Sequence, residues 1–425
     1  MWGNVMCKKY DIIVIGGGFA GFAASVSAAR QGKNVLLIEK YNCLGGAACY
    51  NLVNPFMPYW TTEKESGKRV NLSCGLFSEI INQLDAFNGL HTDACCFNEE
   101  ILKYVLNRMA TESGVKILFQ TYVTDVQSEN GQIKFITVSN VSGSSKFNAD
   151  YFIDATGDGN IAYLAGYKFM LGRQSDNLCQ PMTLCFRLGN VKISENSDVF
   201  SEVNKLYKEY RANCKIKNPR EDVLAFKTVT KDIYHFNTTR VVKLNPTDAS
   251  DVTKAEIQAR EQVFELYDFL RNNFIEFKNS VLLSTGIQIG VRESRMIIGE
   301  HILTQEDIIS CKRFEDSIAV CNYDVDIHSP DGSGTSHYYF PKGKYYTIPY
   351  RCLIPIASKN LLVAGRCVSA THEAQASLRI MPTCCTLGEA AGTAAALAHS
   401  GHENVNKINI ADLQRLLTEN GAKIY

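Results

Sequence analysis

The strongest pattern near the amino end of the chain is a short apolar run followed by small residues at helical spacing. Residues 10–15 are rich in β-branched side chains, which is typical of a strand buried on both faces of a parallel sheet. The alanine-rich stretch 20–31 predicts a helix that ends at Gly32. A second apolar run, 34–39, follows directly, so the order strand, helix, strand predicts one βαβ unit.

The next part of the chain changes from helical to alternating patterns. Residues 97–113 carry apolar side chains at helical spacing and predict an amphipathic helix. Three stretches, 115–126, 133–140 and 147–154, predict short strands, and Asn130-Gly131 is a hairpin turn signal between the first two. We therefore expect a β-meander inserted in the first domain.

A change of character marks a second domain. Residues from about 170 to 345 carry more Lys and Asn and less Gly and Ala, with helices expected at 201–211 and 255–274. The apolar run 361–364 and the small-residue stretch 383–398 then return to the first pattern. We predict a first domain built from residues 1–168 and 348–425, with a second α+β domain at 169–347.

Composition restricts the classes of partner. Lys plus Arg and Asp plus Glu both number 44, so the chain lacks the basic excess of a nucleic-acid binder. Its apolar runs fall far short of the ~18–20 residues that span a bilayer. The amino end shows no apolar signal segment, so we expect a cytoplasmic protein with neither nucleic-acid nor membrane partners. The 15 Cys form no CxxC and the 8 His form neither HxH nor HxxxH, so we expect reduced thiols and no metal site.

The motif that carries the chemistry is Gly16-Gly-Gly18-Phe-Ala-Gly21, which fits GxGxxG between a strand and a helix. Gly16 permits the tight turn, Gly18 lets the backbone approach a pyrophosphate, and Gly21 lets the helix pack closely on the strand. The helix start offers free N–H groups to phosphates. Glu39 lies at the end of the second strand, where its carboxylate can accept both ribose hydroxyls and repel a 2′-phosphate.

Three further features favour FAD over NAD as the dinucleotide. Leu44-Gly-Gly-Ala-Ala48 places a second glycine pair just after the acidic strand. The strand at 147–154 runs into a glycine turn within Asp154–Asn160. Residues 364–366 return to the nucleotide late in the chain, followed by 376–381 and a Gly/Ala helix. A domain that binds NAD has no such late return.

These motifs together resemble a known family. The matching segments are Asp154–Gly159, Gln180–Leu184, Gly290–Arg295, Ile348–Arg351, Gly365–His372, Arg379 and Gly388–Gly392. The combination resembles the FAD-dependent oxidoreductase family within the glutathione-reductase-like (GR2) flavoprotein superfamily. The resemblance implies an α/β fold: a Rossmann-like, three-layer ββα FAD-binding domain with an inserted β-meander, and a second α+β substrate domain. It implies no particular substrate.

The resemblance also implies roles for individual residues, with FAD held non-covalently. Pyrophosphate contacts fall to Gly16, Gly18, Phe19, Ala20 and Gly21; ribose contacts to Glu39 and Lys40; pyrophosphate and isoalloxazine contacts to Gly45, Gly46 and Ala47; adenosine contacts to Val123, Ala155, Thr156 and Gly157; ribityl contacts to Gly365 and Arg366. Arg379, Ile380 and Met381 would bring helix-terminal N–H groups towards the flavin N1/O2 edge. Positive potential there stabilises reduced flavin and favours hydride acceptance.

Candidate catalytic residues lie in three segments. Within Gly290–Arg295, one of Arg292 and Arg295 could clamp a substrate carboxylate while the other pairs with Glu293. His328 ends an alternating segment in which Asp326 points the same way and could fix the imidazole tautomer. His372 follows Gly365 closely. We expect His328 and His372 to act as acid/base groups beside flavin N5.

The reaction class stays open at this point. We expect hydride transfer between flavin N5 and a small organic substrate. One alternative is reduction of a C=C or disulfide bond, fed by NAD(P)H or by a partner protein; Cys43 and Cys49 flank the second glycine pair but do not form the CxxxxC of disulfide reductases. Another is a non-redox or modification role for the flavin. The sequence leaves open whether NAD(P)H is a diffusible donor, which way electrons flow, whether FAD is covalently attached, and whether the chain forms a homo-oligomer.

Overall fold

The computed structural model describes residues 8–194 and 197–425, and its main sheet is largely parallel. The order is β5 (Lys116–Leu118), β2 (Val35–Ile38), β1 (Lys8–Ile15), β8 (Gly143–Asp154), β7 (Gln132–Asn140) and β6 (Tyr122–Glu129), with β19 (Leu361–Val363) also on β8. All neighbours from β5 to β8, and β19, are parallel; β7 and β6 are antiparallel. The expected βαβ unit and the late return of the chain to this sheet are therefore both present.

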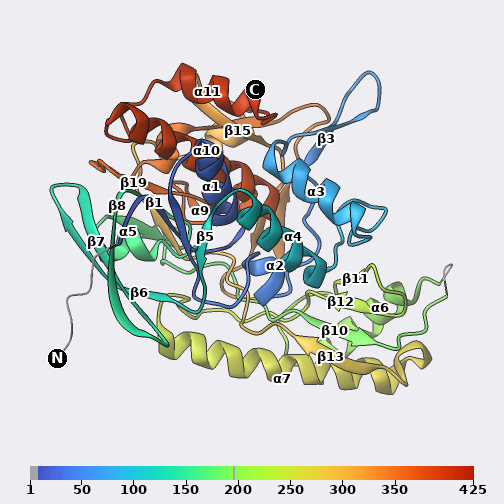
Figure 1. Cartoon of the computed structure of the whole chain (residues 1–425). Helices are drawn as coiled ribbons and strands as arrows, with labels where there is room; N and C mark the ends of the chain where they lie inside the picture. The colour runs from blue at the N-terminus through green and yellow to red at the C-terminus, as the bar shows by residue number, and fades with distance from the viewer. Residues whose placement is uncertain (1–7, 195–196) are drawn as a thin grey trace.

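Two helices from opposite ends of the chain cover one face of this sheet (Figure 1). They are α1 (Phe19–Arg30) and α10 (Met381–Gly401), and they pack side by side. Their backbones approach so closely that a Cβ on Gly388 would lie 2.0 Å from the Ala20 carbonyl oxygen. Small residues on both helices permit this close contact. The two ends of the chain therefore pack into one unit around the main sheet.

The predicted meander is formed by β6, β7 and the first half of β8. The turn between β6 and β7 holds Asn130 and Gly131 at φ 50° and 76°, as a type I′ hairpin requires. Val126, Ile136 and Val138 point from it into the main core. The amphipathic helix α4 (Glu99–Glu112) begins at Asn98, whose side chain accepts hydrogen bonds from the first turn.

A second domain lies beneath the first in the view of Figure 1, and it has an apolar core of its own. Its antiparallel sheet has the order β11 (Ala225–Lys227), β12 (Tyr234–Phe236), β10 (Phe186–Gly189), β13 (Val281–Thr285), and its helices are α6 (Val199–Ala212) and α7 (Ala249–Asn273). The buried side chains of this core run from Met182 to Ile289, whereas those from Ile297 onwards pack into the core of the first domain. The boundaries at 169 and 347 stay a prediction, and this core occupies the central part of that range.

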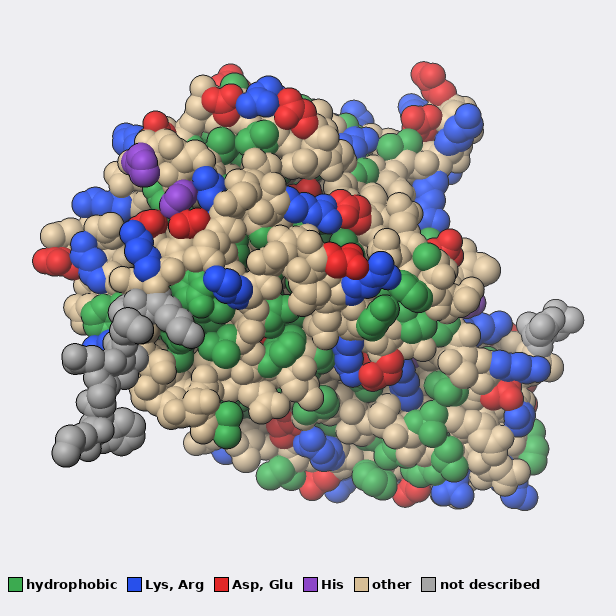
Figure 2. Space-filling model, viewed as in Figure 1, with side chains coloured by type: hydrophobic (Ala, Val, Ile, Leu, Met, Phe, Trp, Pro, Cys, Tyr) green, Lys and Arg blue, Asp and Glu red, His purple; other side chains and the backbone are tan. Residues whose placement is uncertain are grey.

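The remaining elements are short. They are α2 (Ala47–Tyr50), β3 (Trp60–Thr62), β4 (Arg69–Asn71), α3 (Leu76–Ala86), α5 (Asn160–Leu164), β9 (Phe169–Leu171), the 3-10 helix η1 (Ile275–Phe277), β14 (Arg295–Ile297), α8 (Gln305–Ile309), β15 (Ser317–Cys321), β16 (Val325–His328), β17 (Thr335–Tyr338), β18 (Tyr346–Pro349), η2 (Tyr350–Leu353), α9 (His372–Leu378) and α11 (Ile410–Glu419). Among the described helices, none combines the length and apolarity that crossing a membrane requires. Figure 2 shows acidic and basic side chains intermixed over one face of the molecule, in keeping with its zero net charge.

Candidate functional site

One cavity of about 620 Å³ opens where the carboxyl ends of the central parallel strands meet. Ile15, Ile38, Asp154 and Val363 are paired there across β1, β2, β8 and β19. Ligands of open α/β sheets bind at this edge, because the turns that leave the strands can diverge there. The cavity continues from Glu39 past the glycine turn to Arg292 and His328, so it joins the first domain to the second.

The glycine turn has the shape that the motif predicts. Gly16 has φ 102°, and a Cβ on it would lie 2.3 Å from the Ala155 carbonyl oxygen. A Cβ on Gly21 would lie 1.7 Å from the Gly16 carbonyl oxygen. Gly18 differs. A Cβ on it would meet only the Gly46 Cα, at 3.8 Å, and Gly18 lines the cavity, so this Cβ would project into the open space. Gly16 and Gly21 therefore serve the turn itself, and Gly18 leaves room for a ligand.

Two helix amino ends supply positive potential to this cavity. In α1 the Phe22 N–H is the first to bond within the helix, to the Gly18 carbonyl, so the preceding N–H groups are free of helical acceptors. Phe19 and Ala20, which carry two of these groups, line the cavity. The 21-residue α10 begins there as well, with Ile380 as its N-cap and Met381 as its first residue. Anionic groups are favoured at both ends.

Glu39 is held in one orientation by the backbone. Its Oε2 accepts from the Gly17 N–H at 2.5 Å and its Oε1 from the Tyr41 N–H at 2.8 Å. The side chain is only 4% exposed, and burial raises its pKa. Each carboxylate oxygen keeps a second lone-pair direction, so the group can still accept hydroxyl donors from the cavity.

The predicted cofactor residues share this cavity. All of them except Gly21 line it: Gly16, Gly18, Phe19, Ala20, Glu39, Lys40, Gly45, Gly46, Ala47, Val123, Ala155, Thr156, Gly157, Gly365, Arg366, Arg379, Ile380 and Met381. Arg366 does so as part of a network, because its Nη2 lies 2.7 Å from Asp158 Oδ1 and its Nη1 donates to Ser294 Oγ at 2.8 Å. The Arg366 guanidinium and the Ser294 hydroxyl hold the pKa of Asp158 below its usual range, although burial opposes this.

The other end of the cavity is built mainly by the second domain and the strand β16. Arg292 lines it and donates to the Pro181 carbonyl at 2.8 Å and to Thr183 Oγ1 at 2.5 Å. Arg379 lines it from the first domain and donates to Gln180 Oε1 at 3.2 Å. Burial, and then repulsion from Arg379, lower the pKa of Arg292 to about 9.

The hydrogen bonds of His328 determine its tautomer. Its Nδ1 lies 3.0 Å from Nη2 of Arg240, and a guanidinium only donates, so Nδ1 carries the lone pair. The proton is then on Nε2, which faces Asp326 Oδ2 at 3.3 Å. Asp326 and His328 thus do point the same way along β16. Burial, and then the charge of Arg292, lower the pKa of His328 to about 3, so the ring is neutral.

His372 and Glu293 lie elsewhere. His372 Nδ1 is 2.8 Å from Glu293 Oε1, both side chains are buried, and neither residue lines the cavity. The predicted pairing of Glu293 with an arginine is therefore wrong, because the segment that leads into β14 directs this carboxylate towards α9. Arg295 lines the cavity but bonds to the Asp158 carbonyl and Asn160 Oδ1, on the nucleotide side.

Comparison with known proteins places the chain in a family. The profile of the family described as FAD dependent oxidoreductase matches residues 11–417. The chain belongs to the FAD-dependent oxidoreductase family. It is accordingly an FAD enzyme of the oxidoreductase class, and the cavity described above is where its cofactor residues gather.

Individual relatives match over shorter segments. Digeranylgeranylglycerophospholipid reductase of Methanocella arvoryzae is 27% identical over 204 residues, which are 45% of this chain and 50% of that protein. Dihydrolipoyl dehydrogenase of Bacillus subtilis is 62% identical over 40 residues, 9% of this chain and 8% of that protein. The matches thus span half or less of these curated relatives. A geranylgeranyl bacteriochlorophyll reductase-like structure from Thermoplasma acidophilum superposes with a TM-score of 0.51 at 12% identity, covering 97% of this chain and 84% of that one, which is a likeness of fold alone.

Three polar residues that the family motifs do not mark also face the cavity. Asp326 has a buried Oδ1 without a hydrogen-bond partner, Tyr323 places its hydroxyl 3.4 Å from Asp326 Oδ2, and Asn237 accepts from Arg292 at 3.4 Å. The alternation of Tyr323–His328 contained a signal for Asp326. Nothing local marked Asn237, since it reaches the site through the second sheet.

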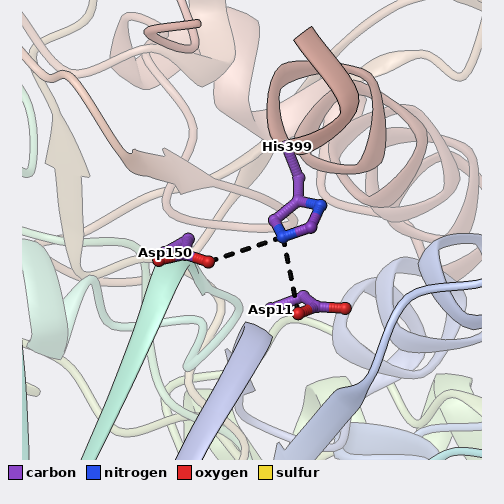
Figure 3. A group of neighbouring side chains, drawn as sticks. All are labelled: Asp11, Asp150 and His399. Atoms are coloured by element: carbon purple, nitrogen blue, oxygen red, sulfur yellow. Dashed lines mark ion pairs between the residues drawn. The ribbon is translucent and has the colours of Figure 1, made fainter. Parts of the chain in front are cut away.

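Two other clusters lie outside the cavity. Asp11, Asp150 and His399 meet at the opposite edge of the sheet, where His399 Nε2 is 3.4 Å from both carboxylates (Figure 3). Because His399 lies in the last turn of α10, this cluster ties the helix end to β1 and β8.

Cys43 and Cys49 are buried behind the second glycine pair, and neither lines the cavity. The hydrogen bond from Cys49 lowers the pKa of Cys43 to about 7.

The assignment of the His328 tautomer leads to a prediction. We expect the imidazole to remain neutral, protonated on Nε2, well below pH 6.5, because its folded pKa is about 3. In the unfolded chain it protonates near its ordinary value, so its contribution to stability is present above about pH 6.5 and is lost as the pH falls towards 3. Nitrogen-15 NMR of histidine-labelled protein tests this, with His328→Gln to identify the signal. An imidazole that titrates near pH 6.5 would contradict it.

Proposed function

We propose that this protein uses FAD to transfer a hydride between flavin N5 and a small organic substrate held at the end of the cavity next to the second domain. The observation that carries the proposal is a single cavity that contains both the nucleotide turn and the group Arg292, Asp326 and His328. A site for a nucleotide alone would not need a group of ionisable side chains such as these at its far end.

The residues present fit FAD. The open space at Gly18, the two helix amino ends and the oriented Glu39 match a diphosphate followed by a ribose. FAD would be held by these groups and by the backbone around Gly45 and Gly365, and when bound it accepts or donates a hydride. The start of α10 would stabilise negative charge on the reduced cofactor.

Arg292, next to the second domain, and strand β16 would position the substrate and handle its proton. Asp326 is the group we assign to the proton, because it lines the cavity and its buried Oδ1 has no hydrogen-bond partner. His328, Arg379 and Arg292 hold the pKa of this carboxyl below its usual range, although burial opposes this, so the group is an ionised acceptor. Oxidation of a hydroxyl- or amine-bearing carbon removes a hydride from its C–H bond and a proton from its O–H or N–H bond, and Asp326 would accept that proton.

His328 would position the Asp326 carboxylate through its Nε2–H, and Arg240 would hold His328. His372 does not line the cavity and bonds to Glu293, which in turn accepts from the Gln180 N–H, so we assign neither residue to the proton.

A second candidate is reduction of a C=C bond. Several relatives favour it, since three of them are digeranylgeranylglycerophospholipid reductases and others are retinol 13,14-reductases. This reaction needs a proton delivered to the second carbon of the C=C bond, whereas His328, Arg379 and Arg292 hold the pKa of Asp326 below its usual range although burial opposes this. A disulfide substrate has less support, because the two thiols nearest the glycine pair, Cys43 and Cys49, do not line the cavity.

An anaerobic titration with NADH distinguishes these candidates. If the protein oxidises its own substrate, we expect NADH to leave the visible flavin band unchanged and a panel of small hydroxy and amino compounds to contain one that bleaches it. Bleaching by NADH would instead support the reductase. Failure to acquire a flavin band after incubation with FAD would overturn both candidates.

A further inference from the structure

Four arginines gather around the far end of the cavity, and three of them have a carboxylate partner. Arg240 pairs with Glu221 at 2.9 Å, Arg220 with Asp222 at 2.9 Å, and Arg379 lies 3.8 Å from Asp326. Arg292 differs. Within residues 8–194 and 197–425, no carboxylate oxygen lies within 4.0 Å of its guanidinium.

The contacts of Arg292 are all with neutral acceptors. They are the Pro181 carbonyl, Thr183 Oγ1 and Asn237 Oδ1. The first two are bound by Nη1, and only the long contact of 3.4 Å to Asn237 engages Nη2. The guanidinium is therefore fixed in position by one edge, while the group as a whole lines the cavity.

A cation without a counter-ion is costly in such surroundings. Protein encloses Arg292 on the sides away from the cavity, and the neighbouring Arg379 repels it, so its pKa falls to about 9. Uncompensated charges of this kind are rare in protein interiors, because desolvation disfavours them strongly unless an opposite charge is supplied. Asp326 favours the charged guanidinium from beyond 4.0 Å, so a carboxylate in direct contact with Arg292 would have to enter through the cavity.

We propose that Arg292 binds a carboxylate of the substrate, so that the substrate of this enzyme is a small organic acid. This rests on the hydride-transfer function proposed above and adds the substrate class.

The geometry of the site supports a carboxylate in particular. A guanidinium presents parallel N–H donors that match the two oxygens of a carboxylate, and the free Nη2 edge of Arg292 is the part that can do so. Asp326 and His328 line the same end. A substrate anchored by its carboxylate would thus bring its adjacent carbon atoms towards the group that we assign to the proton.

The test uses the smallest carboxylates, which fit whatever the shape of the true substrate. Binding of formate and acetate to the FAD-loaded protein is measured by thermal shift and by perturbation of the flavin band, with sodium chloride at equal ionic strength. Formamide and acetamide are the neutral controls, and inorganic phosphate tests a different anion. The variants are Arg292→Met and Arg292→Lys. Arg351→Gln is the matched control, because Arg351 pairs with Asp316 and does not line the cavity.

We expect the wild-type protein and Arg351→Gln to bind acetate at least about tenfold more tightly than acetamide, as one charged hydrogen bond implies. Arg292→Met should lose this preference while keeping its FAD content, and Arg292→Lys should keep part of it. If Arg292→Met does not fold, the comparison of acetate with acetamide and the Arg292→Lys variant still decide.

Three results would overturn the proposal: equal affinity for acetate and acetamide, tighter binding of phosphate than of acetate, or loss of FAD as the only effect of Arg292→Met, since the arginine would then serve the cofactor. The two proposals also fail separately. If acetate binding depends on Arg292 but no hydride donor or acceptor reacts with the flavin, the carboxylate site is supported and the proposed oxidoreductase reaction is not. If the flavin turns over but acetate binds no more tightly than acetamide, the oxidoreductase reaction is supported and the carboxylate site is refuted.

Discussion

We expect Gly21→Ala to prevent FAD from binding and to destabilise the fold by several kcal/mol, on the order of 3 or more. The new Cβ would lie 1.7 Å from the Gly16 carbonyl oxygen and 3.1 Å from the Ala155 Cβ. The first of these contacts is with backbone, which a rotamer change cannot relieve. Helix α1 would have to move away from β1, and the free N–H groups at its start would leave the cavity.

Gly18→Ala is the matched comparison for this variant. Its Cβ would meet only the Gly46 Cα at 3.8 Å, and Gly18 has φ −67°, which alanine adopts readily. We expect its thermal stability without FAD to match the wild type and its affinity for FAD to fall, because the methyl group projects into the cavity. FAD content by absorbance, together with the melting temperature of the FAD-free protein, separates the two effects. Normal FAD binding by Gly21→Ala would refute the packing role of this glycine.

We also expect Glu389→Gln to stabilise the protein at pH 8 and to leave it nearly unchanged at pH 5. Glu389 lies within α10, is 2% exposed, and accepts one backbone hydrogen bond, from the Leu76 N–H at 3.2 Å. Burial raises its pKa to about 8, and that single hydrogen bond opposes the shift only in part. Among the buried acids of this chain it contrasts with Asp154, which accepts from Thr156, Ile161 and Ala162.

The direction of the pH dependence follows from proton binding. Between about pH 4.5 and 8 the folded protein keeps the proton on Glu389, whereas the unfolded chain releases it. Stability is therefore lost as the pH rises through this window, by an amount on the order of 5 kcal/mol at about 1.4 kcal/mol per pKa unit. A glutamine is neutral throughout and removes this loss.

Urea unfolding of FAD-saturated protein at pH 5 and pH 8 measures the effect. Glu419→Gln is the control, because Glu419 is exposed and paired with Arg415 on α11. We expect the control to behave like the wild type at both pH values. An equal loss of stability at pH 8 in wild type and Glu389→Gln would show that this carboxyl group is ionised in the folded protein.

Much of the fold and of the cofactor end of the site could be predicted from the sequence, because short-range geometry determines them. A turn with Gly16 at φ 102° tolerates few other residues, and the hairpin at Asn130-Gly131 is equally demanding. The segment between 50 and 96 was not predicted, although α3 carries Leu76, Phe77, Ile80 and Leu84 at helical spacing. The stretch 328–337 contains the end of β16 and the start of β17, and this strand pair was not predicted, because strands of four residues each leave too short a pattern to detect.

Local sequence patterns thus predicted the return of the chain to the first sheet, the nucleotide turn and the acidic residue of the second strand. In each of these, neighbouring residues specify the backbone directly. Which ionisable groups meet depends instead on the tertiary structure. Glu293 pairs with His372, 79 positions away, and Arg240 reaches His328 across 88 positions. These pairings depend on how β14, β16 and the second sheet pack against one another, and no local sequence pattern specifies that packing.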